Sequence, residues 1–254
     1  MLEYAGVPMP VPAEDEVRVK VQAAGVNPLD WHYMRGSPFV MRLMTGIGAP
    51  RDASMGRDFA GVVEAVGENV TRFKAGDRVF GGANRASGGV GTYAVQIAKP
   101  MGAEAHGVNS TRNDELMLGL GADQVFDYKK ENYTESEKRY DLILDMVGNH
   151  SLLDNSKGMK PTGRLVQVGG PSEDWVGPFR GAIDALLVGP FMEQEVVSIL
   201  AQLSGDDLAL FATLMSEVKL TSRIDQRFAL ADTAQAIAYS ETGRARGKII
   251  VTVD

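Results

Sequence analysis

A glycine-rich string, Ala86-Ser-Gly-Gly-Val-Gly91, stands directly before a segment, 90–98, whose apolar residues have helical spacing. Glycines in such a place let the backbone turn tightly and approach a pyrophosphate, whose charge then lies at the helix N-terminus. Glycine-rich turns before helices are common, so the string alone is a weak signal. It predicts a dinucleotide-binding loop made by Ser87, Gly88, Gly89, Val90 and Gly91.

Strands and helices alternate over the residues that follow this loop. Short strands are expected at 105–109, 124–128, 141–147 and 163–169, with a helix between the first two that begins near Asn113. The last two strands are almost continuously apolar, which is typical of parallel strands buried on both faces. The pattern predicts an α/β fold with a Rossmann-type, doubly wound parallel sheet over residues 83–205.

Residues 1–82 have a different, β-rich pattern. The segment 17–22 alternates apolar and charged residues, 58–66 is a second strand, and a third follows the turn at Gly76. The stretch 27–55 is expected to be one long loop, because prolines interrupt it. Beyond 206 we expect a helix, a strand, a second helix and a final strand at Lys248, which either half could pair with.

Composition and charge exclude several classes of function. The chain has 33 acidic and 26 basic residues, a formal charge of −7, which argues against nucleic acid or anionic lipid as a partner. It has no cysteine, hence no disulfide, thiolate nucleophile or sulfur-ligated zinc. No apolar run approaches the ~20 residues of a membrane span, and no export signal is evident, so a cytoplasmic location is expected.

The position of Arg112 predicts the cofactor. It lies 21 residues after Gly91, at the end of the next predicted strand, and follows Ser110 and Thr111. An acidic residue there would bind the ribose 2′-hydroxyl of NAD, whereas an arginine suits the 2′-phosphate of NADP. The alternative for Arg112 is that it is an ordinary solvent-exposed charge near the start of a helix. We therefore expect NADPH.

The sequence resembles the medium-chain dehydrogenase/reductase superfamily, in its zinc-free, quinone oxidoreductase-like branch. The matching strings cover nearly the whole chain in the family's order: Asn27-Pro-Leu-Asp30, Gly56-Arg-Asp-Phe-Ala-Gly-Val-Val63, Gly76-Asp-Arg-Val79, the glycine loop, Leu120-Gly-Ala-Asp-Gln-Val-Phe-Asp-Tyr128, Tyr140-Asp-Leu-Ile-Leu-Asp-Met-Val-Gly148 and Gly243-Arg-Ala-Arg-Gly-Lys-Ile-Ile-Val251.

The resemblance implies a GroES-like catalytic domain built from 1–82 and 206–254, with the Rossmann domain 83–205 inserted. It implies hydride transfer between NADPH and a quinone, an enone or another carbonyl compound in the cleft between the domains. It also suggests a homodimer. Tyr128 is placed beside the 2′-phosphate by the family's Asp-Tyr string, and the alternative for it is a half-buried strand aromatic.

Further site residues follow from strand ends and from the family strings. Val147, Gly148, Gly169 and Gly170 end two Rossmann strands, where ligands of such sheets lie, although glycine after a strand is also ordinary turn chemistry.

For the acceptor oxygen, the Asn27 amide is the candidate donor, with Asp30 and His32 to orient it or relay a proton. The alternative is structural: asparagine before proline is a common turn signal, and Asp30 would then only cap the segment that follows. No metal is expected, because the three histidines show no ligand spacing.

The chain departs from the family between Gly82 and Ala86. There the family has several dozen more residues, which finish the catalytic domain and supply the first Rossmann strand. Residues 77–82 would have to serve in both sheets. If they stay in the sheet of residues 1–82, the Rossmann strands lose their central partner. If they move to the Rossmann sheet, the β-barrel of the GroES-like domain is left open. The GroES-like domain is therefore expected to be incomplete. The sequence leaves open whether the stretch is naturally absent, deleted or omitted, and a non-catalytic relative is the alternative function.

Overall fold

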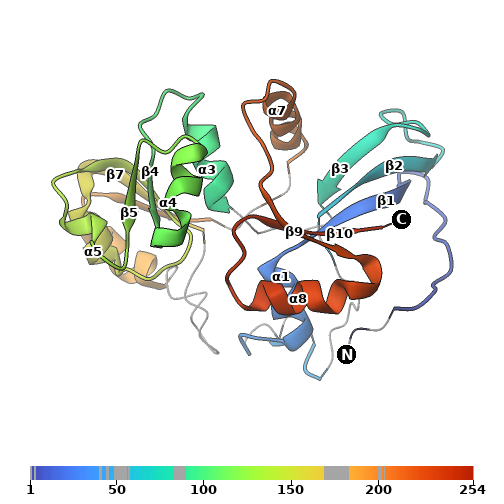
Figure 1. Cartoon of the computed structure of the whole chain (residues 1–254), viewed down its shortest axis with the longest axis horizontal. Helices are drawn as coiled ribbons and strands as arrows, with labels where there is room; N and C mark the ends of the chain where they lie inside the picture. Colours follow the sequence, from blue (N-terminus) through green and yellow to red (C-terminus); the bar gives the residue numbers. More distant parts are fainter. Residues whose placement is uncertain are drawn as a thin grey trace.

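The structure is a computed structural model. It describes residues 2, 4–39, 42–43, 46–48, 56, 58–82, 90–168, 183–199, 202 and 204–253. Strands and helices form two groups that lie side by side (Figure 1): the blue and red ends of the chain share one group, and its green to orange middle forms the other. One group is therefore interrupted in sequence by the other.

The first group is a five-stranded sheet in the order β3-β2-β1-β10-β9. Its strands are β1 (Val17–Val26), β2 (Asp58–Val66), β3 (Arg78–Gly82), β9 (Ile224–Ala229) and β10 (Lys248–Thr252). The final strand, β10, pairs antiparallel with β1 and parallel with β9, which settles the choice that the sequence left open. No pairing between described strands closes this sheet into a barrel, so the GroES-like domain is incomplete.

Two helices pack at this sheet, α1 (Pro28–Arg35) and α8 (Thr233–Glu241). The core beneath them is apolar and buried: Val26, Ala236, Ile237, Ile249 and Val251. The expectation of a simple loop after residue 27 was wrong in its first part. Pro28 is the first residue of α1, where its missing N–H is not needed and its fixed φ suits a helix.

The second group holds only parallel strands, in two separate sheets, β4-β5 and β6-β7-β8. The strands are β4 (His106–Asn109), β5 (Gln124–Asp127), β6 (Tyr140–Asp145), β7 (Met159–Gln167) and β8 (Glu195–Ser198). In order they match the Rossmann sequence 3-2-1-4-5-6 with no strand at position 1 among the described residues. We call the two sheets the β4–β5 half-sheet and the β6–β8 half-sheet.

Helices flank both groups. The remaining helices are α3 (Val90–Ala98), α4 (Asp114–Gly119), α5 (Leu152–Lys157) and α7 (Gly205–Ser216), with 3-10 turns at η1 (Thr111–Asn113), η2 (Tyr133–Glu135), η3 (Gly189–Phe191) and η4 (Leu230–Asp232). Each half-sheet has its own apolar core. The core of the β4–β5 half-sheet is formed by Val95, Ala105 and Ala122. The core of the β6–β8 half-sheet is formed by Leu152, Met159 and Leu165.

The pairing of β3 explains this division. Its five residues pair with β2 from Asp58↔Gly82 to Val62↔Arg78, so the segment stays in the first sheet. Because β3 stays paired with β2, it does not join β4 to β6, and no strand lies between those two among the described residues.

Helix α3 connects the two groups by polar contacts. Gln96 accepts a hydrogen bond from the Thr221 N–H at 2.9 Å, and the Tyr93 and Ser222 hydroxyls lie 2.7 Å apart.

A substitution at Gly61 tests the packing of β1 on β2. A Cβ built there would lie 2.2 Å from the Lys20 carbonyl oxygen, and backbone cannot yield as a side chain would. We expect Gly61→Ala to lower the free energy of unfolding by about 2 kcal/mol, measured by urea titration. The matched control is Gly81→Ala on the neighbouring strand, whose Cβ would meet only Phe59 at an ordinary 3.6 Å. Equal effects of the two would contradict this packing.

Candidate functional site

The carboxyl ends of β4 and β5 bring four of the expected cofactor residues to one edge. Ser110, Thr111 and Arg112 follow β4 directly, and Tyr128 follows β5. The Tyr128 N–H donates to the Asn109 carbonyl oxygen at 3.1 Å, which ties the two strand ends together. The Tyr128 side chain is 54% exposed, so it is available to a ligand.

Two further arginines reach Arg112 from the C-terminal segment. The Arg112 Nη2 donates to the Arg244 carbonyl oxygen at 3.3 Å, and the Arg246 Nη2 donates to the Arg112 carbonyl oxygen at 2.8 Å. We call Arg112, Arg244 and Arg246 the arginine cluster. Our sequence reasoning missed the last two as site residues. Their signal was the string Gly243-Arg-Ala-Arg246, whose paired arginines stand far from Arg112 in the chain.

Asp127, at the end of β5, is held in its charged form beside this edge. It is buried, and it accepts hydrogen bonds from the Thr111 hydroxyl and the Lys129 N–H, with an ion pair to Lys130. The Thr111 hydrogen bond is the main cause that lowers the pKa of Asp127 to about 2. Thr111 is therefore committed to Asp127, which fixes the turn that carries Arg112.

Thr111→Val tests this contact through pH. Because the pKa of folded Asp127 is lowered to about 2 from 3.8, its contribution to stability is complete above pH 3.8 and is lost as the pH falls through 2. Without the hydroxyl donor the folded pKa rises toward 3.8, so we expect a shallower loss of stability over that interval. Acid unfolding followed by circular dichroism measures it, and identical profiles for both proteins would contradict the assignment.

The end of β6 supplies two more of the described site residues, Val147 and Gly148. The N–H groups of Val147 and Gly148 both donate to Asp145 Oδ1, at 3.1 and 2.7 Å, and Gly148 has φ +70°, which favours glycine. At the start of α3, a Cβ on Gly91 would lie 3.3 Å from the Met146 methyl group. A larger residue there would have to displace the end of the Met146 side chain by a few tenths of an ångström. Ser87, Gly88, Gly89, Gly169 and Gly170 lie outside the described residues.

Asn27 lies in a buried polar trio with Asp58 and Lys248. Its side chain is wholly buried, its Nδ2 donates to Asp58 Oδ2 at 3.0 Å, and its Oδ1 accepts from the Lys248 Nζ at 2.8 Å. Lys248 also pairs with Asp58 at 2.8 Å. A Cβ on Gly25 would come within 3.2 Å of Asp58 Oδ2, so the glycine makes room for the trio.

Lys248 is a further site residue that sequence reasoning overlooked, although a lone cation at the start of an apolar strand was a visible signal.

Asp30 and His32 have local partners on α1. Asp30 is buried and accepts the Asn27 N–H at 2.7 Å, the arrangement of a capping box. His32 Nδ1 lies 2.7 Å from the Ser37 carbonyl oxygen, which can only accept, so Nδ1 carries a proton. Burial lowers the pKa of His32 despite this bond. At neutral pH its Nε2 is therefore an acceptor and not a proton donor.

These residues do not fit a zinc ion. Among the residues that the structure describes, no three His, Asp or Glu side chains are grouped to hold a metal. Asp58 is neutralised by Lys248, and Asp30 caps its own helix.

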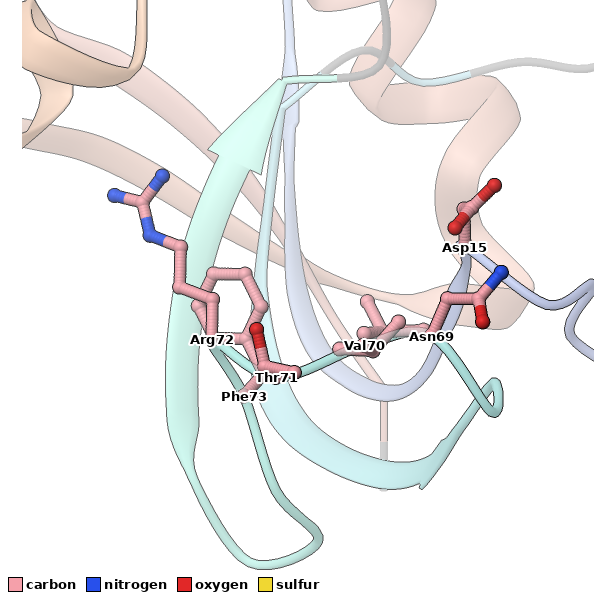
Figure 2. A pocket seen from close by; sticks show the side chains of 7 residues that line it. Asp15, Asn69, Val70, Thr71, Arg72 and Phe73 are labelled. Atoms are coloured by element: carbon pink, nitrogen blue, oxygen red, sulfur yellow. The ribbon is translucent and has the colours of Figure 1, made fainter.

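A cavity of about 310 Å³ opens at the far end of β1 from Asn27 (Figure 2). It is lined by Asp15, Val17, Asn69, Val70, Thr71, Arg72 and Phe73. The Arg72 guanidinium lies 5.6 Å from the centre of the Phe73 ring. None of the described site residues lines this cavity, so it is separate from them.

Comparison with known proteins agrees with this geometry. Residues 120–251 match the family model of zinc-binding dehydrogenases, and residues 13–111 match the alcohol dehydrogenase GroES-like domain. A chloroplastic quinone oxidoreductase of Triphysaria versicolor is 27% identical, over 98% of this chain and 93% of its own. The trans-enoyl reductase pgmF of Aspergillus terreus is 30% identical, over 94% and 87%.

Among solved structures, the quinone oxidoreductase from Coxiella burnetii shares the fold. It superposes with a TM-score of 0.83 at 24% identity, over 98% of this chain and 93% of its own. The chain thus belongs to the medium-chain dehydrogenase/reductase superfamily, among its quinone oxidoreductase-like proteins, which is a class of oxidoreductases that use a nicotinamide cofactor.

The same comparisons show positions that this chain lacks. The alignment with the Triphysaria protein spans 320 positions, whereas this chain has 254 residues, so at least 66 of those positions carry no residue here. The described residues hold no strand between β4 and β6. In the described part of the chain, no helix is both long and apolar enough to span a membrane.

Proposed function

We propose that this chain binds NADPH and reduces a quinone, an enone or another carbonyl compound without zinc. The observation that carries the proposal is the arginine cluster at the carboxyl ends of β4 and β5. Arg112 and Arg246 bring guanidinium groups to this edge, where they donate to backbone carbonyl oxygens, and a phosphate with two negative charges would gain from such groups beside it. NADH has a neutral hydroxyl at that position and gains nothing from them.

Two groups of residues each bind one part of the cofactor, and we call them the adenosine half-site and the nicotinamide half-site. Ser110, Arg112 and Tyr128 hold the adenosine end, with Thr111 fixing the turn through Asp127. The N-terminus of α3, with Val90 and Gly91, and the end of β6, with Val147 and Gly148, receive the pyrophosphate and nicotinamide. For Ser87, Gly88, Gly89, Gly169 and Gly170, which lie outside the described residues, the same role remains a prediction.

The buried trio suits the acceptor oxygen. The reduced nicotinamide, when bound, supplies the hydride. The carbonyl or quinone oxygen then gains negative charge, which a fixed cation stabilises best where water is scarce. Lys248 is such a cation, held by Asp58 and Asn27 and only 13% exposed at its side chain. We propose that Asn27 acts with Lys248 on this oxygen, that Asp30 positions Asn27, and that His32 orients water and does not deliver the proton.

A second candidate function has its own observation in support. The absence of a strand between the two half-sheets, among the described residues, favours a relative that binds NADPH without catalysing turnover. Purified protein incubated with NADPH and a panel of quinones and enones separates the two. Oxidation of NADPH, followed at 340 nm and dependent on the acceptor, supports the enzyme. Saturable binding with no oxidation supports the non-catalytic relative.

The remaining proposals concern context. We propose a cytoplasmic protein that acts on a small molecule, with no nucleic acid or membrane partner, and a homodimer as its assembly. We also propose that residues 1–82 and 206–254 form the catalytic domain and residues 83–205 the cofactor domain.

Light scattering tests the dimer: a mass of twice 27.3 kDa is expected, and a mass of 27.3 kDa would exclude it.

A further inference from the structure

The two half-sheets present unpaired edges to the same gap. In the described residues β4 pairs with β5 alone and β6 with β7 alone. In a complete sheet a central strand would join these edges through two ladders of backbone hydrogen bonds. The separate apolar cores of the half-sheets do not replace that joint. Something else must hold the two at a fixed spacing.

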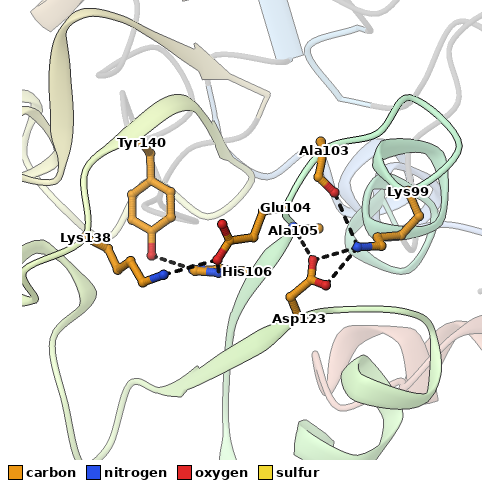
Figure 3. A network of polar contacts seen from close by, with 8 residues as sticks. All are labelled: Lys99, Ala103, Glu104, Ala105, His106, Asp123, Lys138 and Tyr140. Carbon is orange, nitrogen blue, oxygen red and sulfur yellow. Dashed lines mark hydrogen bonds and ion pairs between the residues drawn. The ribbon is translucent and has the colours of Figure 1, made fainter.

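Four side chains span the amino ends of β4 and β6 (Figure 3). His106, the first residue of β4, places its Nδ1 2.9 Å from the hydroxyl of Tyr140, the first residue of β6. The His106 Nε2 lies 2.8 Å from Glu104 Oε1, and Lys138 donates to the same oxygen at 3.1 Å. We call Glu104, His106, Lys138 and Tyr140 the bridge. Each half-sheet contributes two of its members.

The bridge is buried at its centre and its hydrogen bonds have a defined direction. The His106 side chain is 5% exposed, and its ring meets that of Tyr140 edge-on at 5.5 Å between centres. Burial, and then the Glu104 carboxylate, raise the pKa of Tyr140, so its hydroxyl keeps its proton. That proton is available to His106 Nδ1, which leaves Nε2–H to donate to Glu104. On the far side His106 also packs against Phe126 of β5, at 6.1 Å.

We propose that this bridge sets the spacing between the two halves of the cofactor site, so that His106 and Tyr140 are positioning residues for a dinucleotide. The inference rests on the proposed function. The adenosine half-site stands on the β4–β5 half-sheet and the nicotinamide half-site on the β6–β8 half-sheet. At the carboxyl ends the halves meet again where Gly91 approaches Met146. With that contact as a pivot, the bridge at the amino ends prevents rotation of one half against the other.

The consequence is a difference between whole cofactor and fragment. NADPH must contact both half-sites at once, whereas 2′,5′-ADP contacts only the adenosine half-site. Tyr140→Phe removes the hydroxyl and leaves His106 Nδ1 without its partner. We expect this variant to bind NADPH about fivefold to tenfold more weakly, the effect of one buried hydrogen bond, and 2′,5′-ADP as the wild type does. Isothermal titration calorimetry with both ligands measures the two affinities.

A control separates the bridge from general loss of stability. Lys99→Met removes the Lys99–Asp123 ion pair, at 2.7 Å, which lies entirely within the β4–β5 side and crosses no gap. This variant is expected to bind both ligands like the wild type. Equal weakening of NADPH and 2′,5′-ADP in Tyr140→Phe, or an unchanged NADPH affinity, would overturn the inference.

Hydrogen exchange provides a readout that needs no ligand. We expect the amides of β4 and β6 to exchange faster in Tyr140→Phe and at the wild-type rate in Lys99→Met. If the wild type binds neither ligand, the proposed function fails and the cofactor part of the inference with it. Hydrogen exchange then still decides whether the bridge joins the half-sheets. Equal exchange rates of the β4 and β6 amides in the wild type, Tyr140→Phe and Lys99→Met would overturn the bridge itself.

Discussion

Replacement of Lys248 by methionine is expected to lower the free energy of unfolding by about 2–4 kcal/mol. The lysine is the cation of the buried trio, and its loss leaves Asp58 charged and the Asn27 Oδ1 without a donor. Removing one partner of a buried ion pair costs more than the pair contributes, because the other charge stays desolvated. The side chain of Asp58 is 28% exposed, so solvent screening keeps the effect below the top of the range for fully buried pairs.

Two further variants define this effect. Lys160→Met breaks the Lys160–Asp141 pair, whose side chains are 48% and 80% exposed, and should cost less than about 1 kcal/mol. The double variant Lys248→Met with Asp58→Asn should recover part of the loss, because it removes the unpaired charge. Urea unfolding of the four proteins measures this. If Lys248→Met lowered the free energy of unfolding no more than Lys160→Met does, the trio would not be a buried ion-pair network.

Arg112→Gln is expected to weaken NADPH binding by about 10-fold to 100-fold, the effect of losing a charge-assisted contact to phosphate. NADH binding should stay as it is, because the ribose hydroxyl does not need the charge. The preference for NADPH should therefore fall by the same factor. Fluorescence titration of the variant and the wild type with each cofactor measures it.

The control for Arg112 is an arginine at the opposite edge of the sheet. Arg139→Gln changes a residue just before β6, at the amino ends of the strands, where Arg139 bonds only the carbonyl oxygens of Ser136 and Lys138 in the described contacts. It leaves the formal charge of the protein identical to that of Arg112→Gln. Weakening of NADPH and NADH alike in Arg112→Gln, or an equal effect in Arg139→Gln, would contradict the assignment.

The pattern of strands was predictable from the sequence because alternation and apolar runs depend on neighbours in the chain. The strands at 17–22, 58–66 and 105–109 all exist, with ends shifted by a few residues. Helix α1 was missed, because prolines were taken as helix breakers while Pro28 starts a helix. The position of β10 was undecidable from its own residues, since an apolar strand fits either sheet. Its partners β1 and β9 decide it.

The site was predictable only where it follows strand ends. Arg112 and Tyr128 lie at the carboxyl edge because parallel strands end there together. Arg244, Arg246 and Lys248 come from the other end of the chain, and no periodicity links residues so distant in sequence. Asn27 looked free to bind a ligand, yet its Oδ1 accepts from Lys248 and its Nδ2 donates to Asp58, partners that only the fold assembles.

The gap between the half-sheets follows from counting strands. A segment that pairs with β2 cannot also join β4 to β6, and β3 takes the place beside β2, at the edge of the first sheet. The sequence predicted this conflict but not how the structure responds to it. His106 and Tyr140 looked like ordinary strand residues, and only their meeting across the gap identifies the bridge.

Titration of the purified 254-residue protein with NADPH and NADH, followed by nicotinamide fluorescence, tests the central claim most directly. The arginine cluster predicts saturable binding of NADPH at concentrations well below those needed for NADH. Equal affinity for both would contradict the role of Arg112. Binding of neither would show that two half-sheets without their central strand do not form a cofactor site, and would refute the proposed function.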